Sequence, residues 1–134
     1  MTLASCSPRY SKSFPPVAPL LGTWWRAVEV DGRRPDFIAG QKMDIFVTLS
    51  RQGRLKGSGG CNHIDATFVR SGTNVRFGSI SSTRIFCSPE VMARERTFIN
   101  ALRKTVSFAL DGRELRFYDR TGHEVLSFMA ARRP

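Results

Sequence analysis

From residue 20 onward the sequence consists of short apolar runs that end at turn-forming residues, and this pattern restricts the possible folds most strongly. Runs in which apolar and polar residues alternate are typical of β-strands that bury one face. Three dipeptides between runs are typical of tight hairpin turns: Asp31-Gly32, Asp111-Gly112 and Thr121-Gly122. The pattern predicts strands at residues 23–30, 43–50, 55–62, 65–70, 74–80, 106–110, 113–119 and 124–129.

One segment departs from this alternation and predicts an α-helix at residues 88–104. Ser88 is a suitable N-cap and Pro89 a suitable first helical residue, while Arg103 and Lys104 complement the helix dipole at the other end. Apolar residues recur on one face at helical spacing: Val91, Phe98 and Leu102. A single helix between two groups of strands predicts an α+β fold. We expect a curved antiparallel β-sheet, a partly open barrel of about eight strands, with one packed α-helix.

Glu95 falls on the apolar face of this helix, between Val91 and Leu102. A carboxylate buried there needs a partner, because an isolated charge in a protein interior is very costly. Arg84 is the nearest upstream candidate. We therefore expect a structural ion pair between Arg84 and Glu95 that ties the helix to the preceding segment, and we favour this interpretation over a catalytic pair.

The chain of 134 residues is long enough for one domain. Residues 1–19 are rich in serine and proline and contain no acidic residue, which predicts a flexible leader. Residues 20–134 form the predicted domain. No run of about 18 apolar residues predicts a membrane-spanning helix.

Basic residues outnumber acidic ones, 21 against 11, and the formal net charge is +10. Such a charge attracts nucleic acids, lipid headgroups and other anionic partners without selecting among them. The basic residues are dispersed along the chain and interleaved with acids, and the sequence lacks the stacked aromatic motifs of nucleic-acid-binding β domains. We therefore expect no specific binding of nucleic acid.

Four segments, taken in order, resemble one protein family: LLGTWWRAVEVDG, GSGGCN, SSTRIFCSPEVMARERTFINAL and GRELRFYDRTGHEVLSF. The family is that of META domains, the HslJ-like proteins of bacterial envelopes, and the resemblance covers residues 20–129. Its most specific parts are Gly-Cys-Asn at 60–62 and the run at 83–87, although His63 and Ile85 replace residues that are commoner in the family. The resemblance implies a compact β domain with one helix, in a lipoprotein or exported protein without established enzymatic activity. It also implies an association with heat shock and antibiotic tolerance.

The stretch GSGGCNHIDA, residues 57–66, is open to four chemical interpretations. A phosphate-binding loop would need a helix after its glycines, whereas this stretch continues into a predicted strand. A nucleophile formed by Cys61 and His63 lacks an oxyanion-hole motif and a third orienting residue. A zinc site would draw on Cys61, His63, Cys87 and His123, with a spacing unlike that of structural zinc sites.

The fourth interpretation is a disulfide between Cys61 and Cys87, which we favour for a protein exported to an oxidising compartment. By loop entropy, such a bond would stabilise the fold by about 3 kcal/mol. The neighbouring glycines would then bend a strand or let a side chain such as Trp24 or Trp25 cross closely. We expect no metal ion and no cofactor.

The segment LASC, residues 3–6, resembles the lipobox that precedes acylation of a cysteine in bacterial lipoproteins. A signal peptide also needs a basic n-region and an apolar stretch, which the printed sequence lacks before LASC. Either these parts lie upstream of Met1 or the LASC match is a coincidence, and we favour the first interpretation. Cys6 would carry the lipid, and Ser7 after it permits sorting to the outer membrane. We therefore expect a lipoprotein attached through Cys6 to the outer membrane, on the periplasmic face of the cell envelope, and a soluble chain without the lipid.

We expect a noncatalytic, monomeric lipoprotein that binds an envelope protein or an apolar or anionic ligand. Trp24 and Trp25 are adjacent on a predicted strand, so one of them would face away from the core. That tryptophan would either supply an aromatic contact or be covered by the leader or the helix. Arg33 and Arg34, in the loop that follows, would add anionic contacts. An enzyme that uses Cys61 and His63 is an alternative. An inhibitor of a cell-wall hydrolase is another, although a +10 protein would be repelled by a basic lysozyme-like target.

Overall fold

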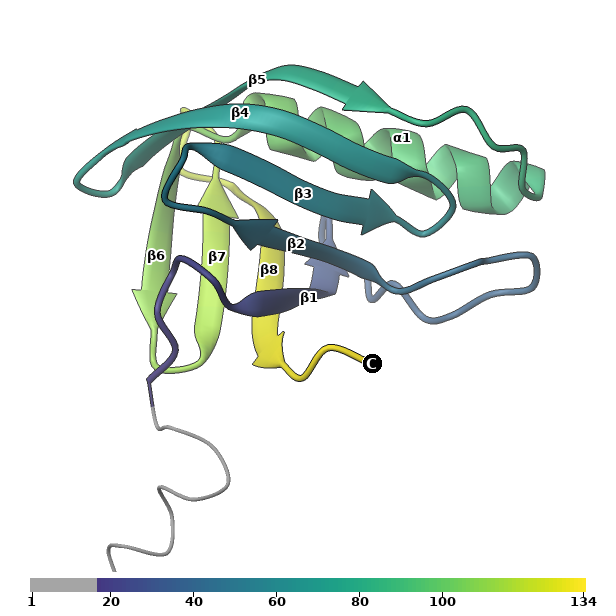
Figure 1. Ribbon diagram of the computed structural model, residues 1–134, viewed down its shortest axis with the longest axis horizontal. Helices are drawn as coiled ribbons and strands as arrows, with labels where there is room; N and C mark the ends of the chain where they lie inside the picture. Colours follow the sequence, from purple (N-terminus) through teal and green to yellow (C-terminus); the bar gives the residue numbers. More distant parts are fainter. Residues whose placement is uncertain (1–16) are drawn as a thin grey trace, which may run out of the picture.

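The computed structural model describes residues 17–134, which form one curved sheet of eight antiparallel strands and a single helix (Figure 1). The elements are β1 (Trp24–Val30), β2 (Ile45–Leu49), β3 (Arg54–Gly59), β4 (His63–Ser71), β5 (Asn74–Ser82), α1 (Pro89–Lys104), β6 (Ser107–Asp111), β7 (Glu114–Tyr118) and β8 (Glu124–Ala131). The predicted α+β class and the predicted order of strands and helix are confirmed. The lipobox-like segment and Cys6 lie outside the described residues.

Each strand pairs with its neighbours in the sequence, and β1 also pairs with β8, so the sheet closes into a ring. The pairing of β5 with β6 is the shortest in this ring, with the single register pair Asn74–Ser107. The predicted curved sheet of about eight strands is therefore confirmed, and the junction of β5 with β6 is its most open part.

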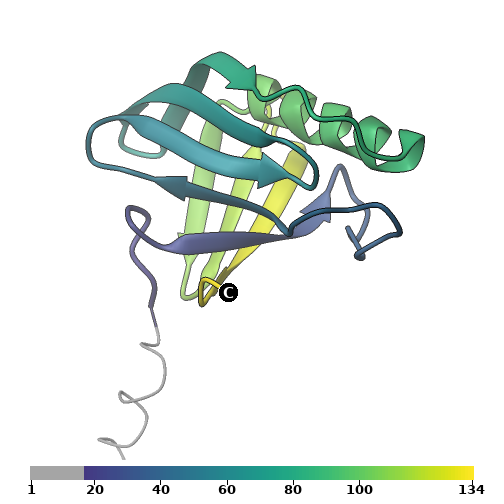
Figure 2. The same ribbon diagram turned by 45° about the vertical axis from the view of Figure 1, so that its right-hand side comes forward.

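Helix α1 lies across one end of the ring, alongside β5 (Figures 1 and 2). It contacts β1, β3, β5 and β8, which come from different parts of the ring. Its buried face contains the predicted apolar residues and the predicted carboxylate: Val91, Glu95, Phe98, Ala101 and Leu102. The helix therefore covers that end of the core. Within residues 17–134, the helix lacks the length and apolar character that crossing a membrane requires.

The core contains the inward-facing side chains of the strands and the buried face of α1. Trp25, Phe98, Phe117 and Phe128 are its largest fully buried side chains. Phe128 on β8 packs edge-on against Phe98 and Phe117, with ring centroids 6.5 and 5.1 Å away. Edge-on aromatic pairs add to the stabilisation that burial of their area supplies. These contacts join the helix to β7 and β8.

The predicted turn after β1 depends on left-handed backbone at two consecutive residues. Asp31 has a φ of 51° and Gly32 a φ of 80°. Such a pair is typical of the type I′ turn, which matches the twist of antiparallel strands and favours aspartate followed by glycine. The N–H groups and carbonyl oxygens of Val30 and Arg33 exchange hydrogen bonds across this turn. The Asp-Gly signal in the sequence is therefore confirmed.

The packed domain begins before residue 20, where the sequence analysis placed its start. Ala18 is 3% exposed, and its N–H donates to the carbonyl oxygen of Gly112 at 2.9 Å. The carbonyl oxygen of Leu20 accepts a hydrogen bond from Nε1 of Trp25 at 3.0 Å. The last residues of the predicted leader thus belong to the domain, because local composition does not reveal hydrogen bonds to distant segments.

Candidate functional site

The predicted disulfide joins Cys61, in the turn between β3 and β4, to Cys87, just before α1. The two Cα atoms are 6.2 Å apart, and Cys61 is fully buried. Because the sulfur atoms are bonded to each other, neither is available as a nucleophile or as a zinc ligand. The pair of Cys61 with the exposed His63 and the proposed zinc site are therefore incompatible with the oxidised protein. No group of three or more histidine, cysteine, aspartate or glutamate side chains that could hold a metal ion occurs among residues 17–134.

Glu95 extends from α1 to the same turn between β3 and β4, and it is 4% exposed. Its Oε1 accepts hydrogen bonds from the N–H of Cys61 at 3.1 Å and the N–H of Asn62 at 2.8 Å. Its Oε2 accepts a third hydrogen bond from Nδ2 of Asn62 at 2.8 Å. The buried carboxylate oxygens and the buried N–H groups of the turn therefore all have hydrogen-bond partners. Buried polar and charged groups are tolerated in a protein interior when they are bonded in this way.

The predicted ion pair between Arg84 and Glu95 is wrong. Arg84 is exposed, and the residues that hold the carboxylate are Cys61 and Asn62. No salt bridge links Arg84 to Glu95 in the part of the chain that the structure describes. The prediction assumed that a buried carboxylate needs a cation. In this structure, main-chain and side-chain amide groups bind the carboxylate instead of a cation. Such donors are not recognised when only oppositely charged side chains are considered.

Asn62 connects this turn to the segment before α1, and sequence reasoning missed its role. Its Oδ1 accepts hydrogen bonds from the N–H of Ile85 at 2.6 Å and from Oγ1 of Thr83 at 2.9 Å. Its Nδ2 also donates to the carbonyl oxygen of Ile85 at 3.2 Å. The Gly-Cys-Asn triplet was the available signal, because an asparagine beside a structural cysteine can bond main-chain groups of a second segment. Together with the disulfide, Asn62 holds residues 83–87 in one conformation.

Gly59 allows Glu95 to approach the sheet. A Cβ atom at Gly59 would lie 2.5 Å from Cγ of Glu95, which is too close for carbon atoms. The expectation that the glycines permit a close crossing is therefore confirmed for Gly59. The side chain that crosses is Glu95, however, and not Trp24 or Trp25.

Gly59→Ala is expected to lower the free energy of unfolding by about 1 to 3 kcal/mol, because the added methyl group must displace Glu95 from the turn. Urea unfolding measures this change. The matched control is Gly78→Ala on β5, where an added Cβ would meet only Oγ1 of Thr67, at 3.4 Å. The control should change stability by less than about 0.5 kcal/mol. Equal effects of the two substitutions would contradict the role given to Gly59.

Both tryptophans of the predicted ligand surface are buried, so this part of the prediction is wrong. Trp25 lies in the core at 0% exposure, and Trp24, on the opposite face of β1, is 7% exposed. Trp24 stacks on Phe46 of the neighbouring strand β2, with ring centroids 4.8 Å apart. Alternation along a strand shows which side chains share a face, but it does not show whether an adjacent strand covers them.

Arg33 and Arg34 are exposed in the segment that follows β1, as the sequence analysis expected. Arg34 lines a hollow of about 800 Å³ between this segment and the strands β1, β7 and β8. Three arginines and five carboxylates line this hollow. Burial of Glu124 and repulsion by Glu29 raise the pKa of Glu124 above its usual value. Since acidic groups outnumber basic ones, this hollow does not fit the anionic ligand that the arginines suggested.

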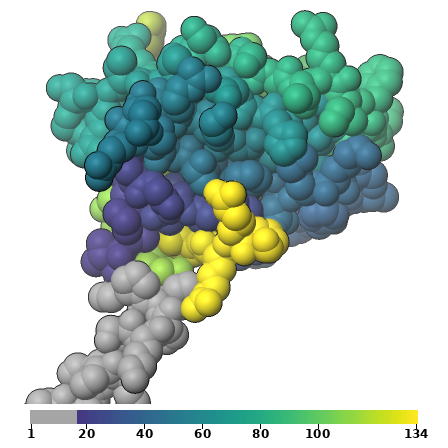
Figure 3. Space-filling model, viewed as in Figure 1, coloured from purple at the N-terminus to yellow at the C-terminus, as the bar shows by residue number. Residues whose placement is uncertain are grey.

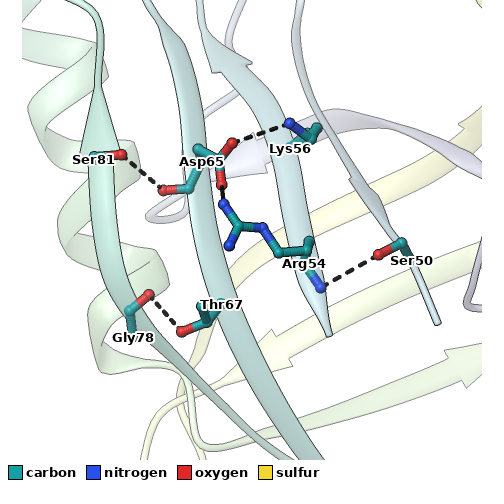
Figure 4. Close-up of polar contacts among 7 residues, drawn as sticks. All are labelled: Ser50, Arg54, Lys56, Asp65, Thr67, Gly78 and Ser81. Atoms are coloured by element: carbon teal, nitrogen blue, oxygen red, sulfur yellow. Dashed lines mark hydrogen bonds and ion pairs between the residues drawn. The ribbon is translucent and has the colours of Figure 1, made fainter. Parts of the chain in front are cut away.

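On the outer face of β3 and β4, three charged side chains are paired with one another (Figure 4). Asp65 on β4 contacts both Arg54 and Lys56 on β3. Hydrogen bonds from Lys56 and then Arg54 hold the pKa of Asp65 below its usual value. Exposed ion pairs of this kind contribute little to stability. We interpret this face as a solvated side of the sheet.

A second hollow, of about 530 Å³, lies between β5 and α1, and we call it the β5–α1 groove. Sequence reasoning missed it. Phe86 is 89% exposed and Ile85 is 42% exposed, on the segment that the disulfide and Asn62 hold. The available signal was this pair of adjacent apolar residues outside any predicted strand or helix. Five apolar residues and two arginines line it together with polar residues of β5 and of the buried network: Ile80, Ile85, Phe86, Met92, Ile99, Arg84 and Arg96.

Solved structures of other proteins share this fold. An NMR structure of a protein from Burkholderia xenovorans has a TM-score of 0.66 at 24% identity, over 88% of this chain and 91% of that one. A crystal structure of a DUF4847 family protein from Bacteroides vulgatus ATCC 8482 has a TM-score of 0.60 at 18% identity, over 86% and 96% of the two chains. A further NMR structure has a TM-score of 0.64 at 16% identity, over 83% and 91%. No curated protein matches the chain significantly.

The family model of the META domain matches residues 18–132. The match begins at Ala18, the residue whose burial and hydrogen bond mark the start of the packed domain. It includes both cysteines of the disulfide, Asn62 and Glu95. The resemblance seen in four sequence segments is thereby confirmed, and the chain belongs to the META domain family.

Proposed function

We propose that this chain is a noncatalytic binding domain of a lipoprotein exported to the bacterial cell envelope. The disulfide between Cys61 and Cys87 carries this proposal, because structural disulfides persist in oxidising compartments and are rare in the cytosol. The lipobox-like segment at residues 3–6 supports attachment through a lipid on Cys6, and Ser7 supports the outer membrane as the destination. The association of HslJ-like proteins with heat shock and antibiotic tolerance supports a role under envelope stress.

Binding is favoured over catalysis because the side chains that could react have structural partners. Cys61 and Cys87 are bonded to each other. Glu95 accepts its hydrogen bonds from Cys61 and Asn62. The surface keeps a net charge of +10 and exposed apolar side chains, including Phe37 and Phe86. Such a surface suits a partner or ligand that is both anionic and apolar.

Mass spectrometry of the protein made from its complete reading frame, in its bacterial host, tests this proposal. We expect an acyl group on Cys6 after cleavage before that residue. We also expect Cys61 and Cys87 to resist alkylation until a reductant is added. Free thiols at both positions together with an unmodified Cys6 would show that the protein is not exported.

The Cys6→Ala variant separates anchoring from folding. We expect it to carry no acyl group and to keep the upstream apolar stretch, because cleavage before residue 6 depends on the acylated cysteine. It should retain the bond between Cys61 and Cys87, since Cys6 is not part of that pair. An acyl group on this variant would show that the lipid is attached to a different residue.

A further inference from the structure

Strand β5 has an open edge along most of its length. It is paired with β4 from Asn74 to Ser82, but with β6 only at Asn74. Among residues 17–134, no other strand pairs with β5. An unpaired strand edge presents N–H and C=O groups to which another extended chain can bond.

The hydrogen bonds at the two ends of β5 show which groups face the open side. Val75 donates its N–H to Val106, on the side of β6. A register shift near Ser79, whose φ is 49°, adds one residue to β5 and reverses the alternation that follows. Thr83 donates its N–H to β4. Because successive residues point in opposite directions, the N–H and C=O of Ser82 face the open side.

The β5–α1 groove lies along this open edge and offers apolar contacts to a chain placed there. Ile80 comes from β5, while Met92 and Ile99 come from α1. Phe86 extends into solvent from the segment between β5 and α1. An extended peptide that adds to a sheet edge obtains affinity from main-chain hydrogen bonds and specificity from alternate side chains in such pockets.

The segment that carries Phe86 is rigidly supported. Asn62 holds Thr83 and Ile85, and the disulfide holds Cys87. A contact residue that is fixed before binding loses less conformational entropy when the partner arrives. The buried network around Glu95 therefore holds the backbone on either side of Phe86 as well as stabilising the fold.

The charge of the groove indicates the charge of its occupant. Arg84 and Arg96 line the groove, and both are exposed. Among residues 17–134, Glu95 is the only acidic residue that lines it, and its carboxylate is bound by Cys61 and Asn62. An occupant with acidic side chains would complement the two arginines.

We propose that the β5–α1 groove binds an extended acidic and apolar segment of a partner protein, which adds to β5 as a further strand. Alternate side chains of this segment are apolar and enter the groove beside Phe86. Its acidic side chains lie near Arg84 and Arg96. This inference rests on the proposed function as a binding domain and names the chemistry of the partner.

Other occupants fit the groove less well. Residues 1–16 of this chain contain Arg9 and Lys12 and no acid, so the two arginines would repel them. A second copy would bring the same arginines to the contact. The chain enters the fold on the lower side of Figures 1 and 3, whereas the segment between β5 and α1 lies at the upper right of Figure 1.

A displayed library of short random peptides, selected against the oxidised protein, tests the proposal. We expect enrichment of sequences that alternate apolar and acidic residues. The amide hydrogen of Ser82 should exchange more slowly in the complex with a synthetic enriched peptide than in the free protein. Failure to enrich such sequences, or protection at a different surface, would overturn the inference. The disulfide and acylation measurements would be unaffected, so the proposed function is tested separately.

Two variants locate the binding. Phe86→Ser changes an exposed side chain. It should lower the affinity for the enriched peptide by about tenfold or more without lowering the melting temperature of the protein. Ser82→Pro removes an N–H on the open side and should weaken binding similarly. The matched control is Val69→Ser, which changes a 69% exposed residue on β4 and should leave affinity unchanged.

Three results would overturn the assignment of the groove to a partner segment. Equal affinity of the peptide for the Phe86→Ser variant and the original protein would exclude the groove as the binding site. Concentration-dependent dimerisation that Phe86→Ser abolishes, measured by sedimentation, would assign the groove to a second copy. Binding to phosphatidylglycerol vesicles that depends on Phe86, without any enriched peptide, would assign it to a lipid surface.

Discussion

Replacement of both Cys61 and Cys87 by serine is expected to lower the free energy of unfolding of the oxidised protein by about 2 to 5 kcal/mol. The bond joins residues 26 positions apart and restricts the unfolded chain. It also holds the start of α1 against the turn between β3 and β4. Urea unfolding of the two proteins, followed by tryptophan fluorescence, measures the difference.

Reductant provides the control for this experiment. Treatment with dithiothreitol should bring the original protein close to the double serine variant and should leave the variant unchanged. Double replacement is preferred, because a single serine leaves one free thiol that can form other disulfides. Equal melting temperatures of the original protein with and without reductant would show that the bond contributes nothing to stability.

Glu95→Ala is expected to destabilise the protein by about 3 to 5 kcal/mol. The carboxylate accepts hydrogen bonds from the N–H groups of Cys61 and Asn62 and from the side chain of Asn62. These donors are buried, and each donor left without an acceptor costs about 1 to 3 kcal/mol. Thermal unfolding monitored by circular dichroism provides the measurement.

Glu95→Gln is the matched variant, since glutamine has nearly the same shape. Its carbonyl oxygen can accept the hydrogen bonds from the main chain of Cys61 and Asn62. Its amide group then faces the Nδ2 donor of Asn62, so one hydrogen bond is lost. We expect a loss of about 1 to 3 kcal/mol, smaller than that of Glu95→Ala. If both substitutions were harmless, the buried network would not be structural.

Much of the fold could be predicted because its signals are local. The turn at Asp31-Gly32 needs left-handed backbone that aspartate and glycine adopt readily. The helix begins at Pro89 and ends at Lys104, as its end signals indicated, although the Ser88 hydroxyl donates to the carbonyl oxygen of Ala39 and does not cap the helix. These features depend on neighbouring residues, so the printed order of amino acids is sufficient to recognise them.

The partners of the buried polar groups could not be predicted in the same way. Glu95 was correctly placed on the buried face of α1, but its donors lie in a turn more than 30 residues earlier. One of the two adjacent tryptophans was correctly expected to face away from the core, but the structure shows that it is Trp24 and that Phe46 of β2 covers it. Both outcomes depend on which distant segments contact each other. The pattern of apolar residues within one segment does not show this.

The sequence by itself determined the alternation of eight strands, the position and the ends of the one described helix, the two cysteines available for a bond and the resemblance to a family. Only the tertiary structure decided which groups bind the Glu95 carboxylate, that both tryptophans are buried and which strand keeps an open edge. The physical reason is that closing the ring brings together segments that are remote in the chain. Burial and hydrogen-bond partners are properties of that assembly, whereas turn and helix preferences belong to short stretches of residues.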